Sequence, residues 1–350
     1  MNESGSDDLA PAFRRLIERH GPMPVSRYMG ESNARYYAAR DPLGAAGDFT
    51  TAPEISQMFG EMVGLWLADL WSRSGKKDAA YVELGPGRGT LAADALRAMA
   101  NQGFTPPVHL VEGSPALREK QADALGQAHF HDHLDTLPED RPLYIVANEF
   151  LDALPVRQLV MTQDGWRERM VALDGEDFVF AAGPNPMDEA IPQERRKQKV
   201  GTVIETSPAA AATVEALARR IEAQGGAALF IDYGYLSPRN GETLQAVQRH
   251  QKVNVFTAPG AMDLTALVDF STLADIARRE GMAVDMTTQG RWLSLLGIGR
   301  RARSLAQGNP GQAAAIAAAH DRLVGADAMG DLFKVMAITP RDGPRGAGFG

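Results

Sequence analysis

Apolar residues recur at helical spacing in two segments near the start of the chain, residues 9–20 and 55–70. Residues 27–52, between them, show no clean period, and we expect a long loop there that serves as a lid. Thr51 and Glu54 have the spacing of a capping box, which predicts that the second helix begins at this point.

From residue 79 onward, short apolar runs alternate with segments of helical period. This order predicts an α/β fold with a doubly wound, mostly parallel sheet and helices on both faces. Residues 156–181 break the alternation, because turns at 163–165 and 174–175 separate apolar runs and predict an inserted β-meander. The expected strands of the main sheet have the sequences AYVEL, VHLVEG, AHFHD, PLYIVAN, AALFID, MAVDMTT and DLFKVMAIT.

These patterns divide the chain into three expected parts. Residues 1–75 should hold the N-terminal helices and the lid loop. Residues 76–340 should form the α/β domain, with the β-meander inserted at 156–200. Residues 341–350 are rich in glycine, proline and arginine, a composition that predicts a disordered tail.

Composition narrows the chemistry that the chain can perform. Its 350 residues are 44% hydrophobic and 23% charged, as is typical of a globular enzyme. The absence of cysteine excludes disulfides, thiolate metal sites and a cysteine nucleophile. The 36 basic and 44 acidic residues give a net charge of −8, which disfavours nucleic acid and anionic membranes as partners. No secretion signal or membrane span is evident, so we expect a cytoplasmic protein without membrane insertion.

The sharpest chemical signal is the sequence ELGPGRG at residues 83–89, between an expected strand and an expected helix. Glycines allow the chain to turn tightly there and let a ligand approach the backbone. A dinucleotide fingerprint would need glycine at position 90, where Thr90 stands, so a dehydrogenase is disfavoured. The residues that we expect to contact a cofactor here are Glu83, Gly85, Pro86, Gly87 and Gly89.

Glu112 ends the second expected strand, 27 positions after Gly85. An acidic residue at this place can accept hydrogen bonds from the ribose hydroxyls of an adenosine-containing ligand. Taken alone it would be an ordinary surface carboxylate, but the glycine-rich turn before it favours the binding role.

His129, His131 and His133 would share one face of a strand, and with Asp132 they suggest a metal site. A polar end to the third strand, with Asp132 near an adenine, is the simpler interpretation. We therefore expect no metal ion and count Asp132 among the cofactor-binding residues.

Polar residues also follow the fourth expected strand, at the same edge of the sheet as the glycine-rich turn. Asn148 should contact the cofactor, and Glu149 should face a second substrate. Asp152 is either a second site carboxylate or an N-terminal helix charge. The other residues that we place at this rim are Asp48, Thr50, Thr51, Glu54 and Tyr233.

ELGPGRG together with Glu112 resembles the first two motifs of class I S-adenosylmethionine-dependent methyltransferases. Four further blocks make the likeness specific, and the chain is similar over residues 27–338 to the MidA-like protein arginine methyltransferases. This family includes a mitochondrial complex I assembly factor. The blocks are GDFTTAPEISQMFGE, ANEFLDALPVRQ, FIDYG and DLTALVDF.

The resemblance implies a Rossmann-like, seven-stranded sheet and S-adenosyl-L-methionine as methyl donor. It also implies dimethylation of an arginine on the quinone-side subunit of NADH dehydrogenase, by enzymes of the mitochondrial matrix in eukaryotes. Arginine stays protonated, so carboxylates can orient its guanidinium and accept a proton as charge develops. We expect Glu149 to be the leading acceptor-binding carboxylate, with Asp48 or Asp152 assisting.

Two other functions are compatible with these residues. One is a methyltransferase that acts on a small molecule, which would need a narrow, closed pocket. The other is an S-adenosylmethionine-binding assembly chaperone without essential turnover, which would release no S-adenosylhomocysteine. A homodimer is also compatible with the sequence.

Overall fold

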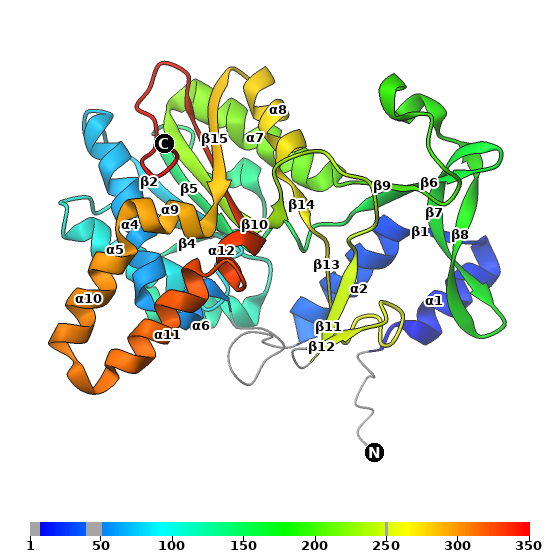
Figure 1. Cartoon of the computed structure of the whole chain (residues 1–350), viewed down its shortest axis with the longest axis horizontal. Helices are drawn as coiled ribbons and strands as arrows, with labels where there is room; N and C mark the ends of the chain where they lie inside the picture. Colours follow the sequence, from blue (N-terminus) through cyan, green and yellow to red (C-terminus); the bar gives the residue numbers. More distant parts are fainter. Residues whose placement is uncertain (1–7, 40–50, 249–250) are drawn as a thin grey trace. The chain divides into compact units, whose positions relative to one another are not determined.

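The computed structural model describes residues 8–39, 51–248 and 251–350, which fall into two compact units (Figure 1). Unit 1 comprises residues 1–42, 152–211 and 238–267, and unit 2 comprises residues 43–151, 212–237 and 268–350. The predicted division, with one domain over residues 76–340, differs from this one. The β-meander groups with the N-terminal helices because β1 pairs antiparallel with β7 of the meander.

The main sheet of unit 2 has eight strands. Seven of them follow the order β15-β16-β10-β5-β2-β3-β4, and the short β14 pairs with β10, so the sheet has one strand more than the resemblance implies. Strands β10, β5, β2, β3 and β4 are parallel, whereas β16 runs antiparallel to both of its neighbours. The strands are β2 (Ala80–Leu84), β3 (Val108–Val111), β4 (His129–His131), β5 (Leu143–Asn148), β10 (Gly226–Tyr235), β14 (Val268–Asp269), β15 (Met282–Thr288) and β16 (Phe333–Pro340).

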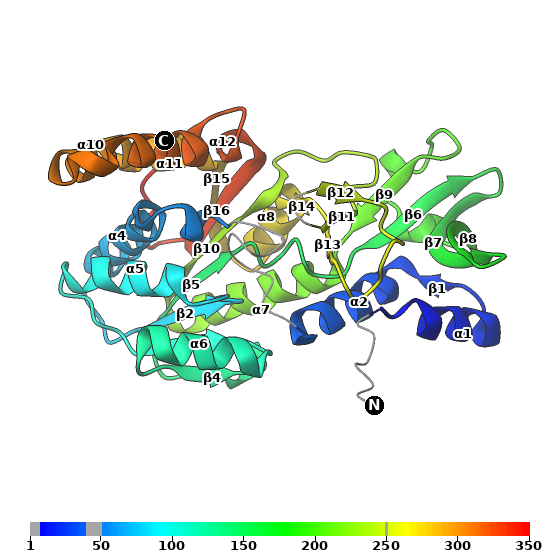
Figure 2. The ribbon, with the colours of Figure 1, turned by 90° about the horizontal axis from the view of Figure 1, so that it is seen from below.

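Helices cover both faces of this sheet, as the strand–helix alternation predicts. Both views show α4 and α5 on one side and α7 and α8 on the other (Figure 1 and Figure 2). On the first side, Trp66, Leu67 and Met99 pack with Tyr144 and Leu229 of the strands in one buried cluster. The helices are α3 (Ala52–Ile55), α4 (Gln57–Arg73), α5 (Thr90–Ala100), α6 (Pro115–Leu125), α7 (Pro208–Gln224), α8 (Phe270–Arg279), α9 (Gln289–Leu296), α10 (Ile298–Gly308), α11 (Ala313–Val324) and α12 (Met329–Leu332).

The helix predicted to start with a capping box at Thr51 is divided in two. Ser56 is extended, with φ −165° and ψ 138°, and separates α3 from α4. Its hydroxyl accepts a hydrogen bond of 3.2 Å from the Met58 backbone N–H, so Ser56 is the residue that caps α4. The Thr51 side chain makes no capping hydrogen bond, and the capping-box prediction was wrong.

Unit 1 contains a five-stranded sheet, in which β6, β7 and β8 form the predicted antiparallel meander, and a three-stranded sheet. Two helices pack with these sheets around a separate buried core that includes Phe13, Tyr28 and Val171. The elements are α1 (Ala10–His20), β1 (Met23–Pro24), α2 (Val25–Ala39), β6 (Arg157–Thr162), β7 (Gly165–Asp174), β8 (Asp177–Pro186), β9 (Val203–Thr206), β11 (Gln245–Gln248), β12 (Gln251–Val253) and β13 (Asp263–Thr265).

The prediction of a loop over residues 27–52 was wrong for its first part, because α2 continues as a helix through Ala39. Residues 40–50 lie outside the described part of the chain. Tertiary contacts account for the helix. Asn33 is buried, its amide nitrogen donates to the Leu264 carbonyl at 2.7 Å, and its amide oxygen accepts from the Leu264 N–H at 3.0 Å. Polar residues that are satisfied in this way interrupt the apolar period without preventing a helix.

Residues 341–350 are held against unit 2, and the prediction of a disordered tail was wrong. The Trp66 indole donates to the Ala347 carbonyl at 3.1 Å, and Arg345 pairs with Asp285 at 2.9 Å. A Cβ at Gly346 would collide with the Trp66 ring, so glycine here permits close packing of backbone on an aromatic side chain.

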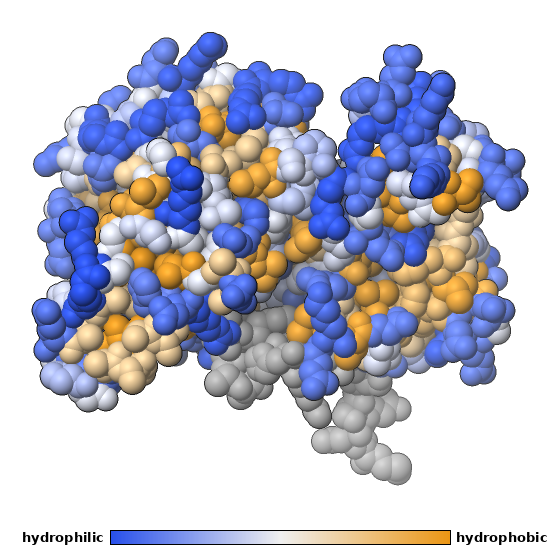
Figure 3. Space-filling model, viewed as in Figure 1, coloured by the Kyte–Doolittle hydropathy of each residue, from blue (hydrophilic) through white to orange (hydrophobic). Residues whose placement is uncertain are grey.

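Hydrophilic and hydrophobic side chains alternate over the face shown in Figure 3. Across the described residues, no helix has the length and apolar character that crossing a bilayer would require. Large hydrophobic side chains that are exposed include Leu65, Val200, Leu295 and Leu332.

Candidate functional site

The glycine-rich turn connects β2 to α5 at the carboxyl edge of the unit 2 sheet. Gly85, Gly87 and Gly89 have φ values of +60°, +57° and +81°, a region that residues with a side chain rarely adopt. A Cβ at Gly85 would also lie 2.9 Å from the Phe150 ring. The turn therefore depends on glycine for its shape, and it brings a tight backbone bend to the start of α5, where a polar ligand can be bound.

Glu83 lies directly before this turn, in β2, and is buried. The Tyr81 hydroxyl donates a hydrogen bond of 2.6 Å to its carboxylate. Burial raises the pKa of Glu83 to about 8, although the Tyr81 hydrogen bond acts in the opposite direction. Glu83 is therefore mostly protonated at neutral pH and can donate as well as accept hydrogen bonds.

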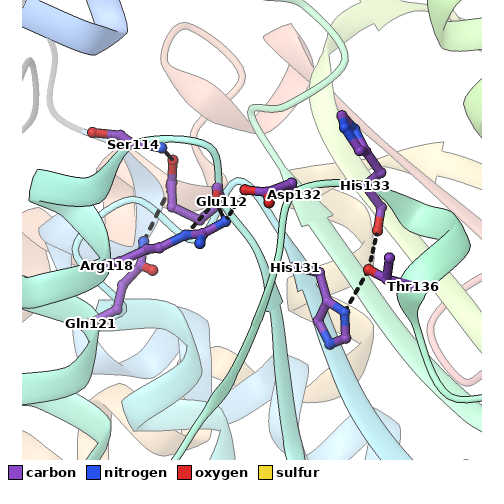
Figure 4. Close-up of polar contacts among 8 residues, drawn as sticks. All are labelled: Glu112, Ser114, Arg118, Gln121, His131, Asp132, His133 and Thr136. Atoms are coloured by element: carbon purple, nitrogen blue, oxygen red, sulfur yellow. Dashed lines mark hydrogen bonds and ion pairs between the residues drawn. The ribbon is translucent and has the colours of Figure 1, made fainter.

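The carboxylate of Glu112, at the end of β3, is held by groups of its own chain (Figure 4). The Ser114 N–H donates to one oxygen at 2.7 Å, and the Gln121 amide donates to the other at 3.2 Å. Arg118 donates to the Glu112 carbonyl and pairs with Asp132 at 2.5 Å. Burial raises the pKa of Glu112, and these donors partly oppose the rise. Two predicted cofactor residues are thus joined through one arginine.

The histidine cluster at β4 includes a residue that the sequence analysis overlooked. His109 in β3 lies 2.9 Å (Nδ1) from Nε2 of His131, and its ring stacks on His129 with centroids 4.7 Å apart. His131 is also 2.8 Å from the Thr136 hydroxyl. Within the ranges that the structure describes, no group of three or more His, Asp or Glu side chains is arranged to hold a metal.

Glu149 follows β5 and has a φ of +51°, which is unusual for a residue with a side chain. Its carboxylate accepts three hydrogen bonds, from the Ala52 N–H at 3.2 Å, the Asn148 amide at 3.1 Å and the Tyr233 hydroxyl at 3.1 Å. Burial raises the pKa of Glu149 to about 7, against the effect of these donors. A strained, partly buried carboxylate that titrates near neutral pH is typical of a functional site.

Of the predicted rim residues, Glu54 contacts the start of α5, directly after the glycine-rich turn. Its carboxylate accepts a hydrogen bond of 2.5 Å from the hydroxyl of Thr90, the first residue of α5. Thr51 precedes Ala52, whose N–H binds Glu149. The segment before α4 therefore contacts both the start of α5 and the Glu149 carboxylate.

Three predicted rim residues remain, namely Asp48, Thr50 and Asp152. Asp48 and Thr50 lie outside the described residues. Asp152 belongs to unit 1, where its side chain is buried and its carbonyl accepts from the Ala266 N–H at 3.0 Å. An assisting role for Asp48 or Asp152 stays a prediction.

Sequence reasoning missed Gln121 and Phe150, and it placed Asp232 at the rim only as part of the motif FIDYG. Asp232 is buried and accepts from the backbone N–H groups of Leu151 and Tyr233, both at 2.9 Å, which fixes the chain after β5. Gln121 could have been noticed, because it lies four residues after Leu117 and therefore on the buried face of α6.

The donors and acceptors of this edge fit a nucleoside-bearing cofactor. Two buried oxygens, Oε1 of Gln121 and Oδ1 of Asn148, have no hydrogen-bond partner among the described residues. Buried acceptors of this kind are rare unless a ligand or water supplies a donor. With the Glu112 carboxylate, they provide acceptors suited to hydroxyl and amino groups.

Comparison with known proteins decides which nucleoside. The model of a family described as S-adenosyl-L-methionine-dependent methyltransferases matches residues 62–288, more than half of the chain. The chain belongs to this family. The methyltransferase therefore uses S-adenosyl-L-methionine, and the resemblance that the motifs indicate is confirmed.

Individual relatives agree over nearly the full chain. The protein arginine methyltransferase NDUFAF7, mitochondrial, of Mus musculus is 35% identical, over 96% of this chain and 86% of the relative. The Homo sapiens protein of the same name is 34% identical, over 97% and 86%. A superfamily member from Burkholderia thailandensis, solved with bound S-adenosyl-homocysteine, superposes with a TM-score of 0.85 at 31% identity, over 97% of this methyltransferase and 95% of that chain.

Proposed function

We propose that this methyltransferase transfers methyl groups to arginine side chains of a protein and that Glu149 binds the acceptor guanidinium. The observation that carries the proposal is the Glu149 carboxylate itself. Described residues fill three of the roughly four acceptor positions of an ionised carboxylate, which leaves one for an N–H of the substrate. The relatives named protein arginine methyltransferase support this acceptor.

The proposed cofactor site is the carboxyl edge of β2, β3 and β5. Glu112 would accept from the ribose hydroxyls, and Asp132 would lie at the adenine side, since Arg118 joins it to Glu112. The glycine-rich turn, with Glu83 and Asn148 beside it, would hold the rest of the nucleoside and its amino-acid group. The positive φ values of its glycines, which residues with a side chain rarely adopt, support this assignment. The turn residues are Gly85, Pro86, Gly87 and Gly89.

When bound, S-adenosyl-L-methionine supplies a methyl group that is already activated by the positive sulfur. The work left to the chain is to orient the acceptor and to exclude water, and alignment alone can lower a barrier by roughly 7–11 kcal/mol in favourable cases. Guanidinium is protonated, so the attacking nitrogen loses a proton during transfer. Glu149, with a pKa of about 7, is suited both to orient the cation and to receive that proton.

The finer features of the function follow the family resemblance. We propose dimethylation of an arginine on a subunit of NADH dehydrogenase, by a cytoplasmic bacterial protein that can form a homodimer. The mitochondrial relatives support a protein substrate of this kind. The doubly wound, seven-stranded methyltransferase sheet, with β14 as an addition, is part of the same proposal.

The decisive variant is Glu149→Gln. The introduced glutamine keeps the oxygen that accepts from Ala52 and Asn148, and its amide can donate to the Tyr233 hydroxyl, so the local structure is retained. The variant should bind S-adenosylhomocysteine with wild-type affinity in isothermal titration and lose at least about 100-fold in methyl transfer to host lysate, the range that general acid–base groups contribute.

A matched control is Glu205→Gln, which changes a buried glutamate that is hydrogen-bonded by Gln158 and Thr243. It should retain both affinity and transfer. If Glu149→Gln keeps its transfer rate, Glu149 does not bind the acceptor. If the wild-type protein binds the cofactor but transfers no methyl group, the chaperone function replaces the enzymatic one.

A further inference from the structure

One buried glutamine joins the two cofactor motifs. Gln121 lies in α6 and is fully buried. Its amide nitrogen donates to the Gly87 carbonyl at 2.7 Å and to the Glu112 carboxylate at 3.2 Å. Figure 4 shows the Gln121 amide directed at the Glu112 carboxylate, beside Arg118. The glycine-rich turn and the acidic residue of β3 are thus held at a fixed separation by a single side chain.

The orientation of this amide follows from its partners. Both groups within reach of Nε2 are acceptors, so the nitrogen, and not the oxygen, must face them. The oxygen then points elsewhere, and it has no partner among the described residues. A buried amide oxygen without a donor is unfavourable, and a hydroxyl of a bound nucleoside, or a water bound with it, would remove that penalty.

The Glu112 side chain is held in one rotamer only if both of its carboxylate oxygens are hydrogen-bonded. The Ser114 N–H binds one of its oxygens at 2.7 Å, and the Gly113 backbone also acts on the group. Gln121 binds the other oxygen, so the plane of the carboxylate is fixed before any ligand arrives. An acceptor pair that is fixed in this way selects ligands with two adjacent hydroxyls, because each hydroxyl meets an oxygen already in place.

We propose that Gln121 is a positioning residue that orients Glu112 toward the ribose diol of the cofactor and thereby makes binding selective for ribonucleosides. The inference rests on the proposed cofactor role of Glu112 and not on the identity of the methyl acceptor. Gln121 acts on the ribose diol through Glu112, so its effect on affinity should depend on Glu112 being present.

A double-mutant cycle on S-adenosylhomocysteine binding tests this directly. Gln121→Leu keeps the side-chain size and removes the donor, and Glu112→Gln removes the charge. We expect Gln121→Leu to weaken binding about tenfold or more in the wild-type background and less than about twofold in the Glu112→Gln background. Equal losses in both backgrounds would overturn the proposal.

A second ligand separates positioning from general packing. The 2′,3′-dideoxy analogue of S-adenosylhomocysteine lacks the diol, so Gln121→Leu should change its affinity less than about twofold. The matched control is Gln224→Leu, which removes another helical glutamine whose amide bridges two carbonyls, those of Pro138 and Arg141. That variant should keep wild-type affinity for S-adenosylhomocysteine, and loss of affinity for both ligands in Gln121→Leu would indicate packing alone.

If Gln121→Leu does not fold, Gln121→Glu provides the test. It places a second carboxyl group beside Glu112, and the two would share a proton at low pH. Affinity for S-adenosylhomocysteine should then rise as the pH falls from 8 to 6, while the wild-type affinity changes less. A parallel pH dependence for both proteins would contradict the proposal. If Glu112→Gln itself weakens both ligands equally, the proposed role of Glu112 fails independently.

Discussion

The Tyr233 hydroxyl donates a hydrogen bond of 3.1 Å to Oε2 of Glu149, which joins the ends of two neighbouring parallel strands, β10 and β5. This bond favours the ionised carboxylate, whereas burial favours the protonated one. Burial has the larger effect, and the pKa of Glu149 is about 7. A group with this pKa is half ionised at neutral pH and can exchange a proton during each turnover.

Removing the Tyr233 hydroxyl should move the pH dependence of catalysis. Because the hydrogen bond stabilises the ionised form, Tyr233→Phe should raise the pKa of Glu149 further, by about 0.7 pH unit for a bond worth about 1 kcal/mol. The acidic limb of kcat/KM, expected near pH 7 in the wild type, should shift upward, with activity recovered at pH 9. An unshifted limb would show that Glu149 is not the group that titrates.

The partly buried charge at Glu149 should lower the stability of the fold. Its folded pKa of about 7 exceeds the ordinary value of 4.5, so the stability that this group contributes is present below pH 4.5 and lost as the pH rises through 7. Glu149→Gln should therefore raise the free energy of unfolding at pH 8, by at most about 3 kcal/mol. The gain should vanish at pH 4, as measured by urea unfolding at both pH values. A destabilised variant at pH 8 would contradict this account.

Alanine substitutions at Gly85, in the glycine-rich turn, and at Gly175, in the β-meander, should cause similar backbone strain and can be compared directly. Gly85 and Gly175 have nearly equal φ values, +60° and +61°, but only at Gly85 would a Cβ meet another group, the Phe150 ring. Gly85→Ala should weaken S-adenosylhomocysteine binding by about tenfold or more, because a loss of only about 1.4 kcal/mol of binding free energy has that effect. Gly175→Ala should lose about 1 kcal/mol of stability and keep its affinity. Equal affinity in both variants would remove the turn from the cofactor site.

His109 should make the protein sensitive to acid. Burial lowers the pKa of His109 to about 4, and the neighbouring His129, His131 and Arg141 act in the same direction. The unfolded chain therefore binds more protons than the folded one between pH 6.5 and 4, and stability falls as the pH falls through that range. His109→Asn can still donate to His131, so its melting temperature should fall less between pH 7.5 and 5. Parallel losses would show that His109 is not responsible.

The sequence predicted those features whose cause is local. The turn at residues 83–89, the acidic residue of β3 and the carboxylate after β5 all follow from strand–helix alternation and from residue types at strand ends. The structure places Glu112 and Glu149 at the same edge of the sheet, as that reasoning requires.

The features that the sequence did not predict depend on tertiary contacts. The polar side chain of Asn33 can be buried in α2 because it is hydrogen-bonded to the backbone of Leu264, 231 residues away. Gly346 is part of an ordered segment because it packs on Trp66, although its composition is typical of disorder. Gln121 is a site residue only because folding brings Gly87 and Glu112 to the same side chain. Partners so distant in sequence leave no periodic signal.

The most direct test of the central claim is to locate the transferred methyl group. The wild-type protein and Glu149→Gln are incubated with S-adenosyl-L-methionine bearing an isotopically labelled methyl group and with host lysate, and the products are identified by mass spectrometry. We predict label on the terminal nitrogens of a protein arginine with the wild type and none with Glu149→Gln. Label on another residue type or on a small molecule, or equal labelling by both proteins, would contradict the account.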